Sequence, residues 1–148
     1  MSLFTSLEKY PVAIEEKDFR IEATVKHKGI NFTAYADCHP EDRDLFSARV
    51  GSTIAHWRTI KTIMEYEASL AKQEWEILSK NYYNLLRNYE TAEDLDPTGK
   101  FRQAMWKADN RYWKYTAIVK ELDEEISKYL QTTGKVFTSI RKRRAKEK

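Results

Sequence analysis

The sequence has few cysteines, glycines and prolines, and each scarcity excludes a class of protein. A single cysteine, Cys38, cannot form an internal disulfide, so nothing favours an oxidising compartment. Only 4 glycines and 3 prolines argue against a β-sandwich, a barrel or a disordered chain. No apolar run reaches the roughly 18 residues of a membrane span, and the N-terminus does not resemble a secretion signal. We therefore expect a cytoplasmic protein without a membrane segment.

Charged and apolar residues are abundant instead. Charged residues make up 33% of the chain and hydrophobic residues 41%, a balance typical of a soluble protein with much helical surface. A chain of 148 residues is long enough to bury a core without disulfides or metals. The composition therefore predicts a single domain over residues 1–148.

The net charge of +3 is concentrated at the C-terminus. Residues 141–148 contribute +5, so the remaining 140 residues sum to 3 − 5 = −2. The cations of this basic tail are Arg141, Lys142, Arg143, Arg144, Lys146 and Lys148. One interpretation is a solvated helix end that favours solubility. The other is an arm that binds nucleic acid or another polyanion through release of counterions.

Two segments near the N-terminus predict a β-hairpin over residues 19–36. Apolar and polar residues alternate in both segments, which is typical of strands with one buried face. Gly29 between them can take the positive φ of a short hairpin loop. Residues 1–18 are interpreted as an arm with room for one short strand or helix near Pro11. The residues predicted to share the buried face are Phe19, Ile21, Ala23, Val25, Ile30, Phe32, Ala34 and Ala36.

The rest of the chain predicts a long antiparallel helical hairpin of coiled-coil type. Residues 44–91 and 100–131 carry apolar residues at spacings of three and four, and the Pro- and Gly-containing segment 92–99 separates them. A short helix with the basic tail is predicted over 135–148, after Gly134. The predicted seam consists of Met64, Ala68, Ala71, Trp75, Leu78, Tyr82, Leu85 and Tyr89, opposite Phe101, Met105, Ala108, Tyr112, Tyr115, Val119, Leu122, Ile126 and Tyr129. The predicted fold class is α+β, a small antiparallel sheet packed on this hairpin.

Further apolar residues recur every seven positions outside this seam. They form one stripe on each helix, Ile63, Leu70 and Ile77 on the first and Trp106 and Trp113 on the second. A two-helix arm has too little surface of its own to bury both stripes, and each tryptophan carries a large apolar area. We therefore expect a homo-oligomer.

The segment 36–58 resembles a chemical site more than any other stretch, because it holds Cys38, His39 and His56. Adjacent Cys and His side chains diverge in an extended segment, and no C-x-x-C or H-x-x-x-H pair is present. We therefore predict a strand-to-helix turn with Asp42 or Asp44 as the helix cap. We expect no metal, no cofactor and no catalytic residue.

A second candidate site is the segment 107–115. Arg111, Trp113 and Lys114, together with Arg58 and Trp106, could bind a partner or stack on a base and contact its phosphate. The alternative is that Trp113 packs at an oligomer interface and the flanking charges are solvated.

Residues 20–60 resemble a pattern in small proteins of bacteriophages and prophages. In those proteins a β-hairpin leads through C-x-P-E-D and F-x-x-x-x-G-x-x-x-A-x-x-R into a helix. The matching residues here are Cys38, Pro40, Glu41, Asp42, Phe46, Gly51, Ala55 and Arg58. The resemblance implies that Gly51 allows close approach of helix and sheet, that Ala55 packs, and that Arg58 makes a surface or pocket contact. The general outline is similar to that of anti-Thoeris counter-defence proteins, which sequester a cyclic ADP-ribose signal between protomers.

The expected function is that of a non-enzymatic, oligomeric, phage-encoded inhibitor in the host cytoplasm. It would bind a host-defence protein or sequester a cyclic nucleotide signal. The alternative is a nucleic-acid-binding or virion-assembly protein that uses the basic tail.

Overall fold

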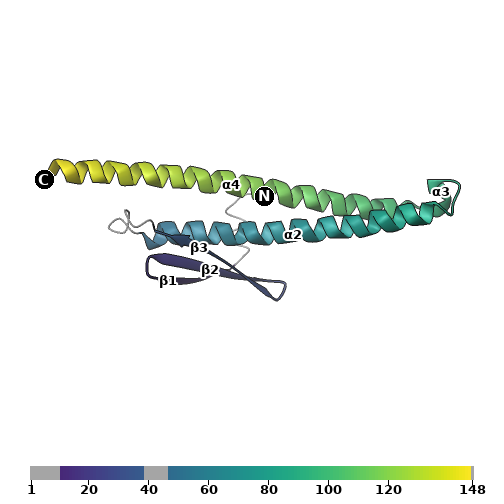
Figure 1. Cartoon of the computed structure of the whole chain (residues 1–148), viewed down its shortest axis with the longest axis horizontal. Helices are drawn as coiled ribbons and strands as arrows, with labels where there is room; N and C mark the ends of the chain where they lie inside the picture. Colours follow the sequence, from purple (N-terminus) through teal and green to yellow (C-terminus); the bar gives the residue numbers. More distant parts are fainter. Residues whose placement is uncertain (1–10, 39–46, 148) are drawn as a thin grey trace. The chain divides into compact units, whose positions relative to one another are not determined.

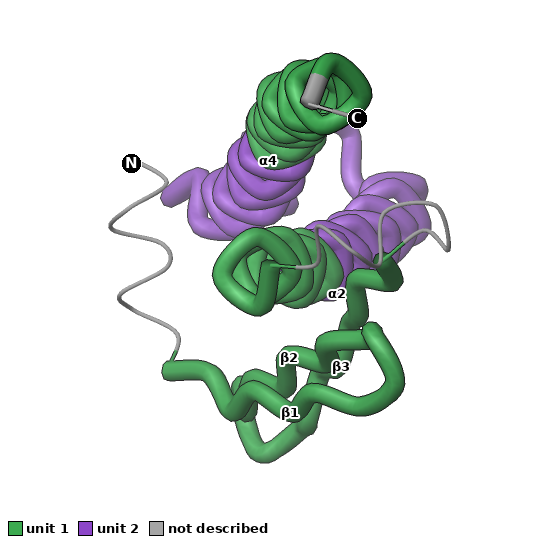
Figure 2. The backbone as a smooth tube through the Cα atoms, turned by 90° about the vertical axis from the view of Figure 1, so that its left-hand side faces the viewer, with its two compact units in different colours: residues 1–63, 120–148 green, residues 64–119 purple. Residues whose placement is uncertain are grey.

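A computed structural model describes residues 11–38 and 47–147 and confirms the α+β class. Its elements in chain order are β1 Ala13–Lys17, β2 Arg20–His27, β3 Ile30–Asp37, α2 Ala48–Leu86, α3 Ala92–Leu95 and α4 Lys100–Glu147 (Figure 1). The chain divides into two compact units, which Figure 2 colours separately. Unit 1 comprises residues 1–63 and 120–148, and unit 2 comprises residues 64–119. Because α2 and α4 each run through both units, their two parts are described separately.

The sheet of unit 1 has three antiparallel strands in the order β1-β2-β3, one more than the predicted hairpin. The additional strand, β1, lies within the predicted arm 1–18. Two-residue turns join the strands, Asp18-Phe19 and Lys28-Gly29, and all four residues have positive φ, as type I′ turns require. Gly29 therefore has the role that the sequence predicted. Phe19 was predicted on the buried face of a strand, but its φ of 64° places it in a turn, where it is 38% exposed.

The predicted alternation of buried and exposed residues holds along the central strand. Ile21, Ala23 and Val25 are buried, and the sheet face that they form packs on the start of α2, where Ile54 and Ala55 are also buried. On β3 the alternation continues to Ala36, which is buried, but Ile30 at the other end is exposed. The difference arises because Ile30 directly follows the turn.

Gly51 determines how closely α2 approaches the sheet. A Cβ atom at this position would lie 2.7 Å from Cδ1 of Ile21, whose side chain is itself buried. Two turns further along α2, the buried hydroxyl of Thr59 lies 2.9 Å from the carbonyl oxygen of Ala23 and 2.8 Å from that of Ala55, so it can donate to either. These contacts are consistent with the structural roles that the phage-protein resemblance implied for Gly51 and Ala55.

The predicted start of the first helix near residue 44, and its Asp42 or Asp44 cap, lie outside the described residues. Its predicted end at residue 91 is wrong, since α2 ends at Leu86. The short α3 follows, and its first turn is capped by Thr91, whose Oγ1 accepts a hydrogen bond of 3.1 Å from the backbone N–H of Asp94. Periodicity alone extended the first helix too far because Tyr89 happens to continue the apolar spacing.

Asp96 caps the start of α4. Its carboxylate accepts hydrogen bonds from the backbone N–H groups of Phe101 and Arg102, at 3.2 and 3.1 Å. Burial acts to raise the pKa of Asp96, but these donors and the Arg102 guanidinium outweigh it, so that its pKa is lower than usual. The cap is therefore ionised at neutral pH, and its stabilising contribution is lost as the pH falls through the lowered folded-state pKa.

The predicted break between residues 131 and 135 is also wrong. The helix α4 runs without interruption from Lys100 to Glu147, so the predicted short helix over 135–148 is its last part. Gly134 costs a helix about 1 kcal/mol relative to alanine, but it keeps its N–H and does not clash as a proline would. Thr138 Oγ1 also donates to the carbonyl oxygen of Gly134, at 2.9 Å.

The two long helices contact each other in antiparallel order within each unit. In unit 1, Trp57 packs edge-on against Tyr129 with ring centroids 5.4 Å apart, and Lys61 Nζ lies 2.7 Å from Asp123 Oδ1. In unit 2, Tyr82 packs against Phe101, also at 5.4 Å. None of the described helices is long and apolar enough to cross a membrane.

The predicted seam is buried only in part. Trp75, Leu85 and Tyr89 are exposed despite their seam positions, and α2 has ended before Tyr89. The seam residues that are buried in one unit or the other are Met64, Ala68, Ala71, Tyr82, Ala108, Leu122 and Ile126.

Two alanine substitutions test the close approach at Gly51. A Cβ added at Gly134 would meet no atom within 4 Å, so Gly134→Ala should stabilise α4 by about 0.5–1 kcal/mol through helix propensity alone. Gly51→Ala gains the same propensity, but overpacking against Ile21 costs about 1–3 kcal/mol, so we expect a net loss of stability. Urea unfolding of both variants measures the difference. An equal gain of stability from both substitutions would show that α2 does not approach the sheet as described.

Candidate functional site

Three aromatic side chains of unit 2 line a shallow groove between α2 and α4. The groove has a volume of about 150 Å³ and is lined by Trp75, Tyr112 and Trp113, with Lys72 and Asp109 beside them. The rings of Tyr112 and Trp113 meet edge-to-face, with centroids 5.2 Å apart. Aromatic walls with one cation and one anion at the rim suit a ligand or partner side chain that is mostly apolar.

The two apolar stripes predicted outside the seam are largely exposed. The predicted homo-oligomer requires this exposure, because a second chain would have to bury them. Trp106 is 63% exposed and Trp113 60%, and on α2 Leu70 is 38% exposed and Ile77 62%. Ile63 is the exception, since it is fully buried within unit 1.

The two stripes have different surroundings. Trp113 shares its groove with two other aromatic residues, whereas the hollow beside Ile77 is lined by the polar side chains of Gln73, Glu76 and Lys80. The exposed large apolar side chains of unit 2 lie on both helices, and two of them, Trp75 of α2 and Trp113 of α4, share the aromatic groove.

The structure separates the predicted base-binding residues. Arg111 forms an ion pair with Glu74 of α2. Two residues along a helix correspond to a rotation of about 200°, so Arg111 and Trp113 lie on nearly opposite sides of α4. Lys114 Nζ lies 5.8 Å from the centre of the Tyr115 ring rather than beside Trp113. Within unit 2, these three side chains therefore do not converge on one point, and their binding role stays a prediction.

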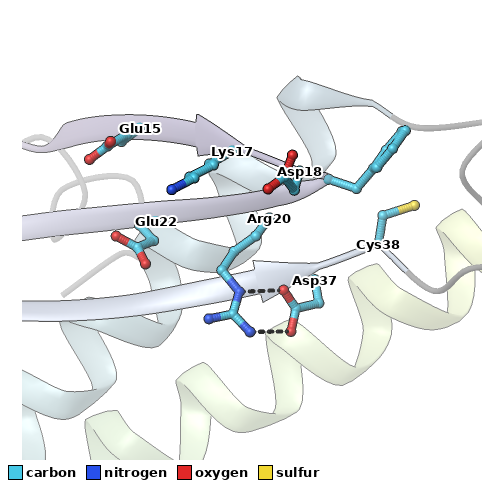
Figure 3. Close-up of a pocket in the computed structure, with 8 residues that line it drawn as sticks. Glu15, Lys17, Asp18, Arg20, Glu22, Asp37 and Cys38 are labelled. Atoms are coloured by element: carbon cyan, nitrogen blue, oxygen red, sulfur yellow. Dashed lines mark hydrogen bonds and ion pairs between the residues drawn. The ribbon is translucent and has the colours of Figure 1, made fainter.

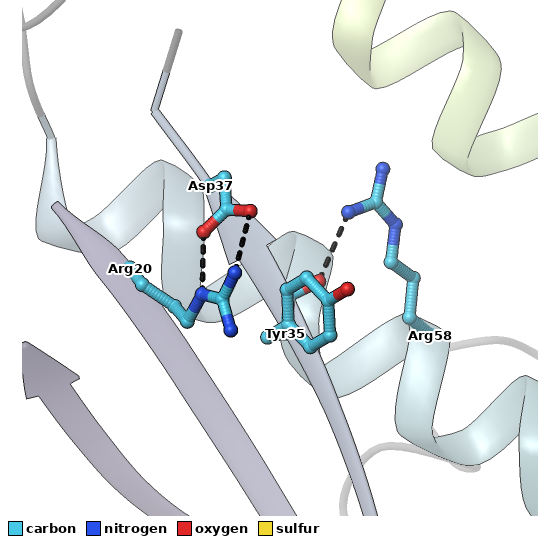
Figure 4. A network of polar contacts seen from close by, with 4 residues as sticks. All are labelled: Arg20, Tyr35, Asp37 and Arg58. Carbon is cyan, nitrogen blue, oxygen red and sulfur yellow. Dashed lines mark hydrogen bonds and ion pairs between the residues drawn. The ribbon is translucent and has the colours of Figure 1, made fainter. Parts of the chain in front are cut away.

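Arg58 belongs to unit 1, where it contacts the outer strand of the sheet (Figure 4). Its Nη1 donates a hydrogen bond of 3.0 Å to the backbone carbonyl oxygen of Tyr35 in β3. That carbonyl belongs to the sheet edge that carries no further strand among the described residues. Arg58 thus fastens α2 to an edge strand and occupies one of its acceptors.

Arg20, Tyr35 and Asp37 form a polar cluster on the exposed face of the same sheet. The Arg20 guanidinium makes a two-point contact with the Asp37 carboxylate, at 2.7 and 3.1 Å, and lies 4.1 Å from the centre of the Tyr35 ring. The hydrogen bonds to Asp37 are the main reason why the pKa of Arg20 is raised above its usual value. Arg20 is therefore held in place by two partners.

This cluster borders a hollow of unit 1 that is about 630 Å³ in volume (Figure 3). Glu15 and Glu22 stand directly opposite each other on β1 and β2, a like-charge pair that disfavours strand pairing. The sequence analysis missed this site, although the alternation of β2 already placed Arg20 and Glu22 on the solvent face. The remaining lining residues are Lys17, Asp18, Phe19, Arg20, Asp37 and Cys38.

The segment 36–58 is only partly described. Cys38 extends the sheet, donating a backbone hydrogen bond of 2.9 Å to the carbonyl oxygen of Phe19, while His39 lies outside the described residues. Among the residues that are described, no group of three or more Cys, His, Asp or Glu side chains could hold a metal ion.

The basic tail forms the last turns of α4. Residues 141–146 are exposed, and Lys148 lies outside the described part of the chain. Cations at a helix C-terminus also interact favourably with the helix dipole, so the tail has a structural explanation beside its proposed polyanion role.

No family model, curated protein or solved structure gives a significant match to this chain. The resemblance to phage counter-defence proteins therefore stays a prediction.

Substitution of Arg58 distinguishes a structural from a ligand-binding role. Arg58→Ala should lower the free energy of unfolding by about 1 kcal/mol and speed amide exchange in β3, because the Tyr35 carbonyl loses its donor. The matched control is Arg49→Ala, an exposed arginine of the same helix, which should change stability little. If the two variants are equally stable, the contact with Tyr35 contributes nothing and Arg58 is available for a ligand.

Proposed function

We propose that this chain is a non-enzymatic interaction protein that works as a homo-oligomer. The observation that carries the proposal is the exposure of Trp106 and Trp113 on one side of α4, next to the groove formed by Trp75 and Tyr112. Monomeric soluble proteins rarely expose several large aromatic side chains together, and tryptophan is enriched at the centres of protein interfaces.

The packing of unit 2 supports this proposal. Its buried seam residues are Met64, Ala68, Ala71, Tyr82 and Ala108, while Trp106 and Trp113 are each more than half exposed. At about 25 cal/mol per Å², removing two tryptophans from water would stabilise an assembly by several kcal/mol. We therefore infer that a second copy of the chain buries this surface.

The more specific proposal is that the oligomer is a phage-encoded inhibitor of host defence. It rests on the resemblance of residues 20–60 and would place the protein in the host cytoplasm. Either a defence protein or its cyclic nucleotide signal would be bound. The groove of unit 2 offers suitable chemistry for a nucleotide, because Trp75 and Trp113 can stack on a base and Lys72 can pair with a phosphate.

The second candidate is a nucleic-acid-binding or virion-assembly protein. One observation favours it, the exposure of the basic residues 141–146 at the end of a single continuous helix. Such an arm would bind phosphates without regard to sequence, and its affinity would fall steeply with salt.

Light scattering tests the oligomer. At micromolar concentration the chain should have a mass at least twice its 17.6 kDa. Replacing Trp106 and Trp113 together by alanine should shift the mass towards the monomer, because the main apolar contact is lost. The matched control replaces Leu70 and Ile77, the exposed pair on α2, and should keep the oligomer. A monomeric wild-type chain contradicts the proposal, and dissociation of the control alone would place the interface on α2.

Material that co-purifies with the protein separates the two candidate functions. If the protein sequesters a nucleotide signal, heating should release a small ultraviolet-absorbing compound, and deletion of residues 141–148 should leave its amount unchanged. If the tail binds nucleic acid, the absorbing material should be long, removable by salt and lost in the deleted variant, whose formal charge is −2. Absence of both kinds of material, with no binding of a polyanion by the full chain at low salt, contradicts both specific candidates.

A further inference from the structure

Four side chains of α4 share one face within unit 2: Trp106, Asp109, Asn110 and Trp113. Their positions are i, i+3, i+4 and i+7, the spacing that lines up side chains along one side of a helix. The two tryptophans and Asn110 are exposed, and Asp109 is half-buried. In the described part of the chain, the side chains of Asp109 and Asn110 make no hydrogen bond or ion pair. This set is called the tryptophan face below.

The tryptophan face has the near-palindromic order Trp106, Asp109, Asn110, Trp113. A two-fold axis perpendicular to α4, midway between Asp109 and Asn110, therefore places Trp113 of a second, antiparallel copy opposite Trp106, and its Asn110 opposite Asp109. Such pairing is self-complementary and suits a two-fold interface, in which both partners use the same patch.

We propose that a second copy of this chain docks on the tryptophan face, with the two α4 helices antiparallel and the two-fold axis between Asp109 and Asn110. This inference rests on the proposed homo-oligomer and names its interface. Trp106 of each copy then packs against Trp113 of the other. The Asp109 carboxylate accepts a hydrogen bond from the Asn110 amide of the second copy.

The charges of the face favour this orientation over a parallel one. A parallel, in-register pair would place the two Asp109 carboxylates against each other in a partly desolvated interface, which is unfavourable for like charges. The antiparallel pair places each carboxylate opposite a neutral amide that can donate to it. Asp109 and Trp113 also line the groove, so the second copy would cover part of it.

Cysteine crosslinking tests the arrangement. In a Cys38→Ser background, which removes the only native cysteine, Asn110→Cys should crosslink to a dimer with a short bismaleimide because both copies lie at the two-fold axis. The control is Ala117→Cys, an exposed residue one heptad further along the same side of α4. In the antiparallel pair the two copies of residue 117 are about 22 Å apart along the helix axis, so this variant should not crosslink. Circular dichroism checks that both variants keep their helices.

The outcomes separate the interface from the proposed function. Crosslinking through position 110 alone supports the antiparallel face, and Trp106→Ala should then weaken dimerisation by about 30-fold. Crosslinking through both positions means a parallel pair and overturns the inference. An oligomer in light scattering without crosslinking at position 110 also overturns it but leaves the proposed oligomer intact. A monomer contradicts both.

Discussion

The close approach of α2 to the sheet is the constraint on which the rest of unit 1 depends. A hairpin with one apolar face is not stable alone in water, so β2 and β3 need a cover. The start of α2 is this cover, and Gly51 lets its backbone come close to Ile21. Ala55, one turn further along the helix, is buried and has only a small side chain. The Thr59 hydroxyl adds a polar link to the strand at Ala23. Larger residues in place of Gly51 and Ala55 would push α2 away from the sheet and expose the apolar face of the strands.

The candidate functional surface of unit 2 consists of aromatic residues that the seam leaves exposed. Met64, Ala68, Ala71, Tyr82 and Ala108 are buried along the seam, whereas Trp75 has a seam position in the sequence but is 39% exposed. Trp75 instead lines the groove with Tyr112 and Trp113. The strongest candidate for binding therefore lies on the outside of the hairpin.

Much of the fold could be predicted from the sequence because it depends on local periodicity. The alternation through Ile21, Ala23 and Val25 and the positive φ of Gly29 follow from strand geometry and turn sterics, which act over a few residues. The wrong predictions are at positions where the rest of the structure overruled a local sequence signal. Gly134 weakens a helix by an amount that a long helix tolerates, and Phe19 was assigned to a strand although the two-residue turn needed its position. The polar site around Arg20 was missed because its contacts with Tyr35 and Asp37 depend on the register of β2 against β3, which the alternation in each strand does not specify.

By itself, the sequence determined the α+β class, the strand faces, the two long helices and the surplus of apolar residues outside the seam. Tertiary structure decided which predicted side chains are available. Arg58 contacts the Tyr35 carbonyl and Arg111 forms an ion pair with Glu74, while Trp106 and Trp113 are left exposed. Periodicity specifies the side of a helix on which a residue lies. Whether that side meets a strand, an oppositely charged residue or solvent depends on segments far apart in the chain, and only folding brings these together.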